Sequence, residues 1–317
     1  MIFTKIPSRF LTFICCFLIL AGCRRTSTQP PVLPTNSSAT LTQTPATASV
    51  AASRRPTPTL LSVSDITTLV KAFAAAWDAR DPQKLLSFYS HDLRSYDATG
   101  NGQFFDYLTI QGVLNSEFAN GAFSVKFNSF FISDDARFAV MIGTFTQSIG
   151  GGKPVTRPYV SLLEFQQGLI IRVLDYYGGA SSKGLPLQTI PATANQPASS
   201  SQAITDVKSM LGKWETAYNT RDIQTYLSFY ADKAQYTQVV SPDRRVLAKN
   251  KLSQEMTSNF TNKAFKSALS SAVVSVDGHF AAVQGLYTND KTSNTPMIII
   301  LEIEGGKIIQ QYDYLLY

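Results

Sequence analysis

The pattern of hydrophobic and polar positions changes from helical to strand spacing twice along the chain. From Asp65 to Trp77 the apolar residues recur every three to four positions, which predicts a first helix. A second, short helix follows at 82–89, and a third is predicted over 105–118. After that, apolar and polar residues alternate as in a half-buried strand, and four long strands are expected, the last at 169–177.

The second half of the chain repeats this order. Helices are predicted at 204–219, 223–230 and 249–261, again followed by strands separated by turns. The Arg80-Asp81 pair recurs 141 positions later as Arg221-Asp222. Such internal repetition predicts two copies of one fold.

The order of the elements predicts an α+β fold class with two tandem domains. In each domain about three N-terminal helices pack on a curved antiparallel sheet. The domains are expected at 61–178 and 204–317, joined by a flexible linker at 179–203 that is rich in Ala, Ser and Pro.

The first 23 residues read as an export signal. Lys5 and Arg9 precede an apolar run at 10–20, which is too short for a transmembrane span. The ending Leu20-Ala21-Gly22-Cys23 resembles the lipobox of bacterial lipoproteins, in which the cysteine carries the lipid. We therefore expect lipidation of Cys23 and an extracytoplasmic, membrane-anchored protein of the bacterial cell envelope. An ordinary secretory signal that happens to contain a cysteine is the alternative.

Residues 24–60 are rich in Thr, Pro, Ser and Ala and contain no acidic residue, which predicts a disordered tether. Cys15 and Cys16 lie inside the signal, so we expect no disulfide in the mature protein. All six excess positive charges precede residue 56, and the rest carries 22 basic and 22 acidic side chains. A neutral folded part disfavours nucleic acid as a partner.

The sequence resembles the nuclear transport factor 2-like superfamily, in its SnoaL-like branch. The resemblance rests on the order of the helices, the aromatic first helix followed by Arg80-Asp81, the Phe88-Tyr89 pair of the second helix and an aspartate near the end of the last strand. The resemblance covers both predicted domains. It implies cone-shaped domains, each with a pocket at the wide end. Members include polyketide cyclases, ketosteroid isomerases, dehydratases, epoxide hydrolases and non-enzymatic modules that bind small molecules or dimerise, so the fold alone does not define the activity.

Asp175 and Asp313 are the strongest candidates for chemistry. The strand period of two places Asp175 in line with Val173 and Tyr177, so its carboxyl is expected to face a hydrophobic interior or pocket. Burial raises the pKa of a carboxyl and can make it a general acid or base, a role that the resemblance to cyclases and isomerases also implies. We favour a structural role, in which the carboxylate accepts hydrogen bonds, over ligand contact, and ligand contact over catalysis.

Further candidates surround these aspartates in the predicted fold. Those for ligand binding are Trp77, Tyr89, Tyr96, Tyr159, Asp175, Tyr218, Tyr230, Tyr236 and Asp313. Asp97, Glu164 and Glu302 are further polar groups that an enzyme could use. Trp77 and Trp214 lie on first helices, where an aromatic residue more often fills the core than lines a pocket.

The sequence contains no metal-binding cluster, phosphate-binding glycine loop or Ser nucleophile elbow, so we expect no metal and no cofactor. His91 and His279 are expected in exposed loops. The favoured hypothesis is a lipoprotein whose two domains bind a small apolar ligand or an envelope protein without catalysis. The alternatives are an enzyme of the cyclase, isomerase or dehydratase type, and a spacer whose sheets mediate contact between domains or between two chains. An open cavity with an aspartate on its wall separates the first two hypotheses from the third.

Overall fold

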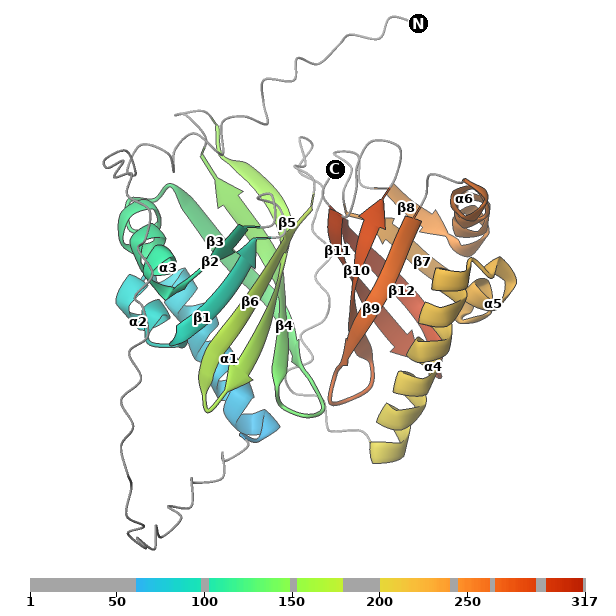
Figure 1. Cartoon of the computed structure of the whole chain (residues 1–317), viewed down its shortest axis with the longest axis horizontal. Coiled ribbons are helices and arrows are strands. Elements are labelled where there is room, and N and C mark those ends of the chain that lie inside the picture. Colours follow the sequence, from blue (N-terminus) through green and yellow to red (C-terminus); the bar gives the residue numbers. More distant parts are fainter. Residues whose placement is uncertain are drawn as a thin grey trace, which may run out of the picture. The chain divides into compact units, whose positions relative to one another are not determined.

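The computed structural model describes seven stretches of the chain: 61–97, 103–148, 153–178, 200–239, 245–262, 266–288 and 295–315. All of them belong to one compact unit, Pro58–Tyr317 (Figure 1). The predicted export signal with Cys23, the tether at 24–60 and linker residues 179–199 lie outside the described residues.

The first domain opens with helix α1 (Val63–Asp78), which begins with a capping box. The Ser62 hydroxyl accepts a hydrogen bond from the Asp65 N–H, and the Asp65 carboxylate accepts one from the Ser62 N–H. The other elements are α2 (Pro82–Leu86), β1 (Tyr89–Asp97), β2 (Gln103–Phe105), α3 (Tyr107–Val113), a π-helical turn (Leu114–Phe118), β3 (Phe123–Ile132), β4 (Phe138–Gln147), β5 (Val155–Gln166) and β6 (Leu169–Tyr177).

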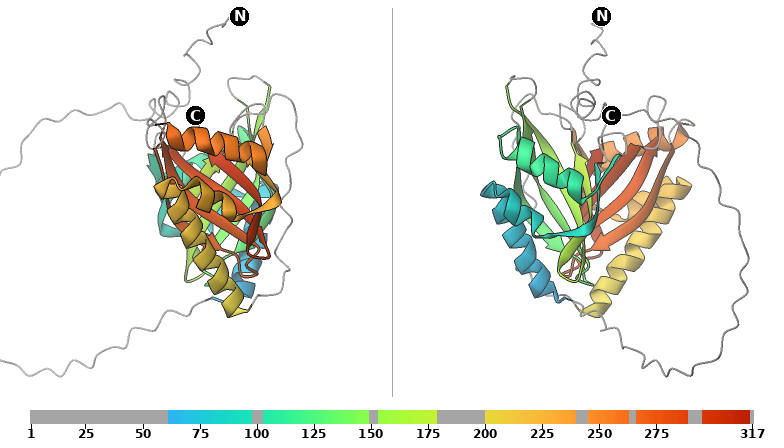
Figure 2. Two further views of the ribbon diagram at one scale, coloured as in Figure 1. Left: turned by 90° about the vertical axis from the view of Figure 1, so that its right-hand side faces the viewer. Right: turned by 60° about the vertical axis from the view of Figure 1, so that its left-hand side comes forward.

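The second domain follows the same plan. Its elements are α4 (Ser201–Thr220), α5 (Ile223–Ser228), β7 (Tyr230–Gln238), β8 (Arg245–Ala248), α6 (Lys249–Thr261), β9 (Lys266–Val274), β10 (Phe280–Thr288), β11 (Thr295–Glu304) and β12 (Lys307–Leu315). Figure 2 shows α4 running along one face of the second sheet. No helix among the described residues is long and apolar enough to span a membrane.

Each domain contains a six-stranded sheet, with the order β2-β1-β6-β5-β4-β3 in the first and β8-β7-β12-β11-β10-β9 in the second. The predicted α+β class and the two separate sheets are confirmed. Successive long strands are antiparallel, but β1 pairs with β6 and β7 pairs with β12 in parallel. This parallel pair arises because the chain leaves β1, passes through helix α3 and further strands, and returns to the side of β1.

Three local predictions need correction. The second helix was predicted over 82–89, but α2 ends at Leu86 and Tyr89 already belongs to β1. His91 was expected in a loop, but it is an exposed residue of β1, which begins at Tyr89 and has an irregularity between Tyr89 and Arg94. The third helix was predicted from residue 105, but Phe105 belongs to β2 and the helix starts after Asp106, whose carboxylate accepts from the Thr109 N–H. Short-range spacing does not reveal the pairing of β2 with Ser95–Asp97 of β1, which makes Phe105 a strand residue.

The repeated Arg-Asp pair has a structural role. Arg80 adopts a left-handed backbone conformation (φ 54°) at the end of α1, and its guanidinium donates to the carbonyl oxygens of Phe118 and Phe123 at 2.7 and 2.9 Å. Asp81 caps α2 by accepting from the Lys84 N–H. Arg221 and Asp222 repeat both features in the second domain. The motif therefore joins the first helix to the last helical turn of its own domain.

A third buried cluster contains residues from both sheets. Phe131 on β3 and Phe280 on β10 stack with their ring centroids 5.9 Å apart. Close by, Ser133 and Ser275 form an isolated antiparallel bridge. The faces of the strands that turn away from the helices are buried here. For this reason β5 is buried without interruption from Pro158 to Phe165 and lacks the alternation of a half-exposed strand.

Candidate ligand-binding site

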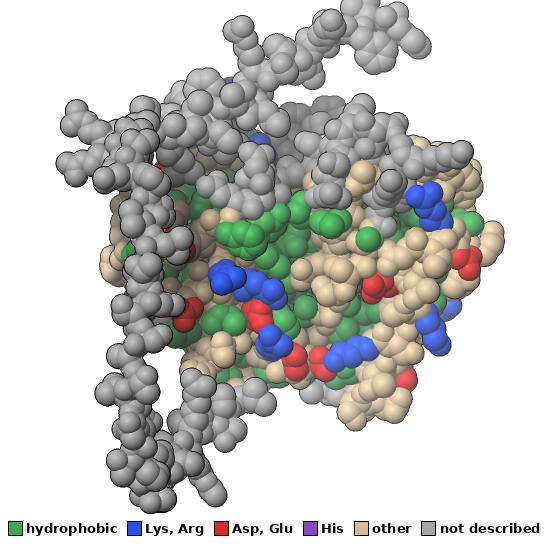
Figure 3. Space-filling view, in the orientation of Figure 1, with side chains coloured by type: hydrophobic (Ala, Val, Ile, Leu, Met, Phe, Trp, Pro, Cys, Tyr) green, Lys and Arg blue, Asp and Glu red, His purple; other side chains and the backbone are tan. Residues whose placement is uncertain are grey.

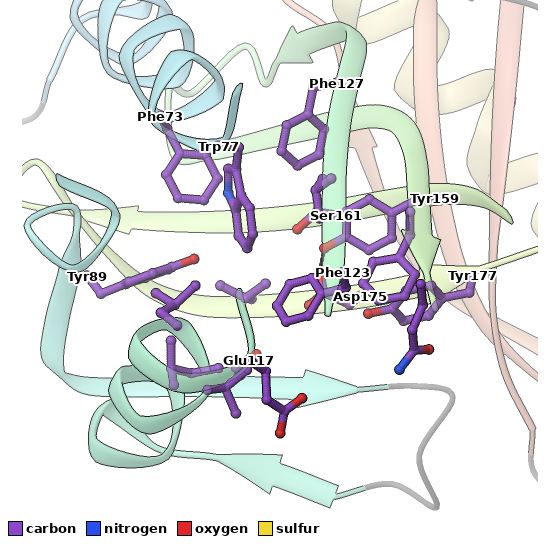
Figure 4. A pocket seen from close by; sticks show the side chains of 18 of the residues that line it. Phe73, Trp77, Tyr89, Glu117, Phe123, Phe127, Tyr159, Ser161, Asp175 and Tyr177 are labelled. Carbon is purple, nitrogen blue, oxygen red and sulfur yellow. Dashed lines mark hydrogen bonds between the residues drawn. The ribbon is translucent and has the colours of Figure 1, made fainter. Parts of the chain in front are cut away.

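The first domain contains a cavity of about 200 Å³ between its helices and its sheet (Figure 4). α1, α3, the π-helical turn and strands β1, β3, β4, β5 and β6 all contribute to the lining. Its aromatic lining residues are Phe73, Trp77, Tyr89, Phe123, Phe127, Phe145, Tyr159 and Tyr177, and its polar ones are Ser95, Glu117, Gln147, Ser161 and Asp175.

Asp175 lies on the cavity wall together with Val173 and Tyr177, which are the residues that the strand period places on the same face. The Tyr159 hydroxyl donates a hydrogen bond of 2.5 Å to Asp175 Oδ1. Burial, followed by the negative charge of Asp175, raises the pKa of Tyr159 well above its ordinary value. Tyr159 therefore stays protonated and acts as a donor to the carboxylate.

Two further donors line the cavity. The Trp77 Nε1–H is buried and has no hydrogen-bond partner among the described residues. Figure 4 shows the Tyr89 hydroxyl turned into the space bounded by Trp77 and Ser161. Burial and the charge of Asp175 raise the pKa of Tyr89, so this hydroxyl also keeps its proton. A buried N–H without a partner is costly, and a ligand with an acceptor atom would satisfy it.

In the second domain the corresponding polar groups bond to one another. The carboxylate of Asp313 accepts from Gln311 Nε2 and from the Tyr236 hydroxyl, both at 2.7 Å. Burial raises the pKa of Asp313 to about 6, although these two hydrogen bonds lower it in part. The Tyr230 hydroxyl accepts from Trp214 Nε1 at 3.2 Å and lies 2.5 Å from the Tyr226 hydroxyl. It also contacts Gln311 Oε1.

The strand registers explain why the domains differ. In the first domain Ser95 pairs with Val173, whereas the matching pair in the second domain is Tyr236 with Gln311. Likewise Ser161 pairs with Asp175, and the residue that pairs with Asp313 is Ile299. At all three positions the second domain carries the larger side chain. All three larger side chains are buried.

The repeat offset indicates two more enlargements. An offset of 141 relates Phe73 to Trp214 and Leu85 to Tyr226, and all four are buried. By the same offset Trp77 corresponds to Tyr218, so the two tryptophans of the chain are not equivalent. Trp214 fills the core of the second domain, as predicted for an aromatic residue on a first helix, whereas Trp77 lines the cavity of the first.

The cavity of the first domain brings together four of the residues that the sequence marked as candidates: Trp77, Tyr89, Tyr159 and Asp175. Tyr96 points to the opposite face of β1, where its ring lies 5.0 Å from that of Phe104. In the second domain Tyr218, Tyr226, Tyr230, Tyr236 and Trp214 belong to one buried cluster around Asp313. Glu164 forms ion pairs with Arg137 and Arg172, and Glu302 pairs in register with Phe280, so neither acid is among the residues that line the cavity.

Sequence reasoning missed several lining residues, among them Ser161, Phe127 and Phe145. Ser161 shares the strand phase of Tyr159, and this spacing was the available signal. Within the described ranges, no group of three or more His, Cys, Asp or Glu side chains is placed to hold a metal ion.

No family model matches this sequence, and no curated protein matches it either. Solved structures do match. A putative polyketide cyclase from Pseudomonas putida is 21% identical, covers 36% of this chain and 91% of its own, with a TM-score of 0.32. A protein with a ketosteroid isomerase-like fold from Catenulispora acidiphila, in complex with trimethylamine, is 21% identical. The match covers 34% of this chain and 84% of the Catenulispora protein, with a TM-score of 0.30.

A Mycobacterium tuberculosis protein in complex with estradiol-17β-hemisuccinate is 15% identical. The match covers 36% of this chain and 94% of the Mycobacterium protein, with a TM-score of 0.32. Each match thus spans a length comparable to one domain. The order of helices and strands in each domain, rather than these low scores, carries the assignment of the fold. Each of the two tandem domains has the order of helices and strands that the resemblance of the sequence to the nuclear transport factor 2-like superfamily implied.

Proposed function

We propose that this protein is a lipid-anchored, extracytoplasmic bacterial lipoprotein that binds a small, mostly apolar molecule in its first domain without catalysing a reaction. The observation that carries the binding proposal is the cavity of about 200 Å³ with aromatic walls and a few convergent polar groups. Ligand sites have this composition, and pockets for drug-sized ligands have volumes of about 300–1,000 Å³, so the ligand of this smaller cavity is small.

The second domain has a structural role in this proposal. Its Asp313, Tyr236, Gln311 and Tyr230 satisfy one another by hydrogen bonds. A ligand would have to break this network and leave polar groups without partners, which costs about 1–3 kcal/mol for each group. We therefore assign ligand binding to the first domain alone.

The anchoring part of the proposal rests on Leu20-Ala21-Gly22-Cys23 and the short apolar run that precedes it. Several acyl chains on one cysteine give stable membrane attachment. On the face shown in Figure 3, Lys and Arg side chains lie beside Asp and Glu side chains, and no large patch of one sign forms among the residues described there. This mixed surface supports the absence of nucleic acid from the proposed partners.

The alternative function is a cyclase or isomerase that uses Asp175 as a general base. One observation favours it: Asp175 lies on the wall of an open cavity with the Tyr159 hydroxyl beside it. Against it, the Tyr159 hydroxyl already occupies one oxygen of this carboxylate with its hydrogen bond. The aspartate whose pKa is raised to about 6 is Asp313, and both of its oxygens are occupied by its own domain.

A thermal-shift screen of the full-length protein against a metabolite panel tests the binding function. A ligand at one hundred times its dissociation constant stabilises the fold by about 2.7 kcal/mol, which shifts the melting temperature measurably. Absence of any shift across the panel contradicts small-molecule binding. For a ligand that binds, Asp175→Asn separates the two functions, because an enzyme would lose turnover of that compound, whereas a binding protein shows no turnover before or after the change.

A further inference from the structure

The cavity of the first domain has an acidic lining. Asp175 and Glu117 contribute carboxylates, and no Lys, Arg or His is found among the described residues that line it. Asp175 is partly buried on the wall, whereas Glu117 is exposed. In a narrow cleft with low-dielectric walls, charges of one sign produce a potential that attracts the opposite sign and repels their own. The cavity is therefore electrostatically suited to a cation and unsuited to an anion.

The aromatic rings add to this preference. Eight of the nineteen lining residues are aromatic. Close to Asp175, the ring of Tyr177 lies 5.0 Å from the ring of Tyr159 and 5.0 Å from that of Phe145, measured between centroids. The Phe145 and Tyr177 planes are nearly perpendicular, at 83°. Several aromatic rings close to a carboxylate are the kind of surroundings that bind ammonium groups.

The remaining polar groups of the cavity constrain the other part of the ligand. The Trp77 N–H is buried without a partner, and the Tyr89 hydroxyl keeps its proton and points into the same space. An acceptor atom of the ligand would satisfy the Trp77 N–H. A hydroxyl, ether or carbonyl oxygen suits this position.

On these grounds, and resting on the proposed binding function, we propose that the ligand is a small organic cation of the amino-alcohol type. Its protonated or quaternary nitrogen lies among Tyr159, Tyr177 and Phe145 with Asp175 as the counter-ion. Its oxygen accepts the hydrogen bond from Trp77 Nε1. Asp175 thus determines the sign of the charge that the cavity selects, and Trp77 determines the position of the ligand's oxygen.

Three probes of closely similar shape and different charge test this inference on the full-length protein by isothermal titration calorimetry. They are the cation choline, its neutral carbon isostere 3,3-dimethylbutan-1-ol, and the anion 3,3-dimethylbutanoate. We expect choline to bind about tenfold or more tightly than the neutral alcohol, and the anion to bind most weakly. In Asp175→Asn, choline should lose this advantage, while the affinity for the neutral alcohol stays within about threefold of the wild-type value.

The neutral probe also serves as the folding control, because a misfolded variant would lose both ligands together. Removal of the distant, exposed carboxylate in Glu304→Gln should leave the ranking of the probes unchanged. Equal or tighter binding of the alcohol or the anion overturns the cation proposal but leaves small-molecule binding intact. The cation proposal is also overturned if the protein binds other neutral compounds and none of these three probes. A chain that binds no compound at all overturns both proposals.

Discussion

The Tyr236 hydroxyl on β7 donates to Asp313 Oδ2 at 2.7 Å, from the strand that pairs in parallel with β12. In the first domain the tyrosine that serves Asp175 lies on the other neighbouring strand, because Tyr159 belongs to β5. The place that corresponds to Tyr236 is taken by Ser95. The equivalent aspartates of the two domains thus accept a tyrosine hydrogen bond from opposite neighbouring strands, and in the first domain the aspartate lies on the wall of a cavity.

Ser95→Tyr should close the cavity by giving the first domain the side chain that the second domain has. We expect ligand binding to fall below detection, because the new ring occupies the ligand's space next to Val173. Calorimetry with a ligand found in the screen measures the effect. Arg94→Tyr is the matched control, because it places the same ring on the exposed neighbouring position of β1. This variant should bind the ligand with the affinity of the wild-type protein. Unchanged binding in Ser95→Tyr would mean that the ligand site is elsewhere.

The raised pKa of Asp313 predicts a dependence of stability on pH. The folded protein holds this proton up to about pH 6, whereas the unfolded chain releases it near its ordinary pKa of about 3.9. This contribution to stability is fully present below the unfolded pKa and is lost as the pH rises through the folded pKa. Its size is on the order of 2–3 kcal/mol.

Urea denaturation between pH 4 and about pH 7 measures this effect, with Asp313→Asn as the comparison. The neutral variant has no proton to lose at this position, so its free energy of unfolding should decrease less over the range than that of the wild-type protein. Parallel pH profiles for the two proteins would show that Asp313 titrates normally.

Loss of the Arg80 guanidinium should destabilise the first domain. Arg80→Met keeps the aliphatic stem but removes the donors to the Phe118 and Phe123 carbonyl oxygens. We expect a loss of about 1–3 kcal/mol in the free energy of unfolding, since hydrogen bonds to charged groups are among the stronger ones. Lys71→Met, at an exposed position of α1, is the control and should change stability by less than about 0.5 kcal/mol. Equal effects of the two substitutions would refute the structural role of the Arg-Asp motif.

Cys23→Ala should release the protein from the membrane fraction of an expressing bacterium. The lipid has no other attachment point in our proposal, because Cys15 and Cys16 leave with the signal. Fractionation followed by mass spectrometry of the mature N-terminal peptide measures both location and acylation. A wild-type peptide without acyl groups contradicts the lipoprotein assignment, and so does a variant that remains in the membrane.

Much of the fold was predictable because it depends on short-range patterns. The apolar spacing of α1, the bounds of α6 at Lys249–Thr261 and those of β6 at Leu169–Tyr177 all follow from local periodicity. The repeated Arg-Asp pair indicated two equivalent domains. The placement of Asp175 with Val173 and Tyr177 on one face follows from the period of a strand.

The difference between the two domains was not predictable in the same way. The difference depends on the residue that pairs with Val173 in the first domain and with Gln311 in the second. Both pairings join parallel strands that are far apart in the sequence. A single sequence does not define this register. The sequence therefore did not show that Ser95 and Tyr236 occupy equivalent positions, one beside a cavity and the other bonded to an aspartate. The same limit explains why Tyr96 was a candidate although its ring packs against Phe104 on the other face.

The most direct test of the central claim is the stoichiometry of ligand binding to the full-length chain, measured by calorimetry at protein concentrations well above the dissociation constant. Binding confined to the aromatic cavity of the first domain requires one ligand per chain and none in the Ser95→Tyr variant. Two ligands per chain, or one ligand that persists in Ser95→Tyr, would contradict the assignment of binding to the first domain.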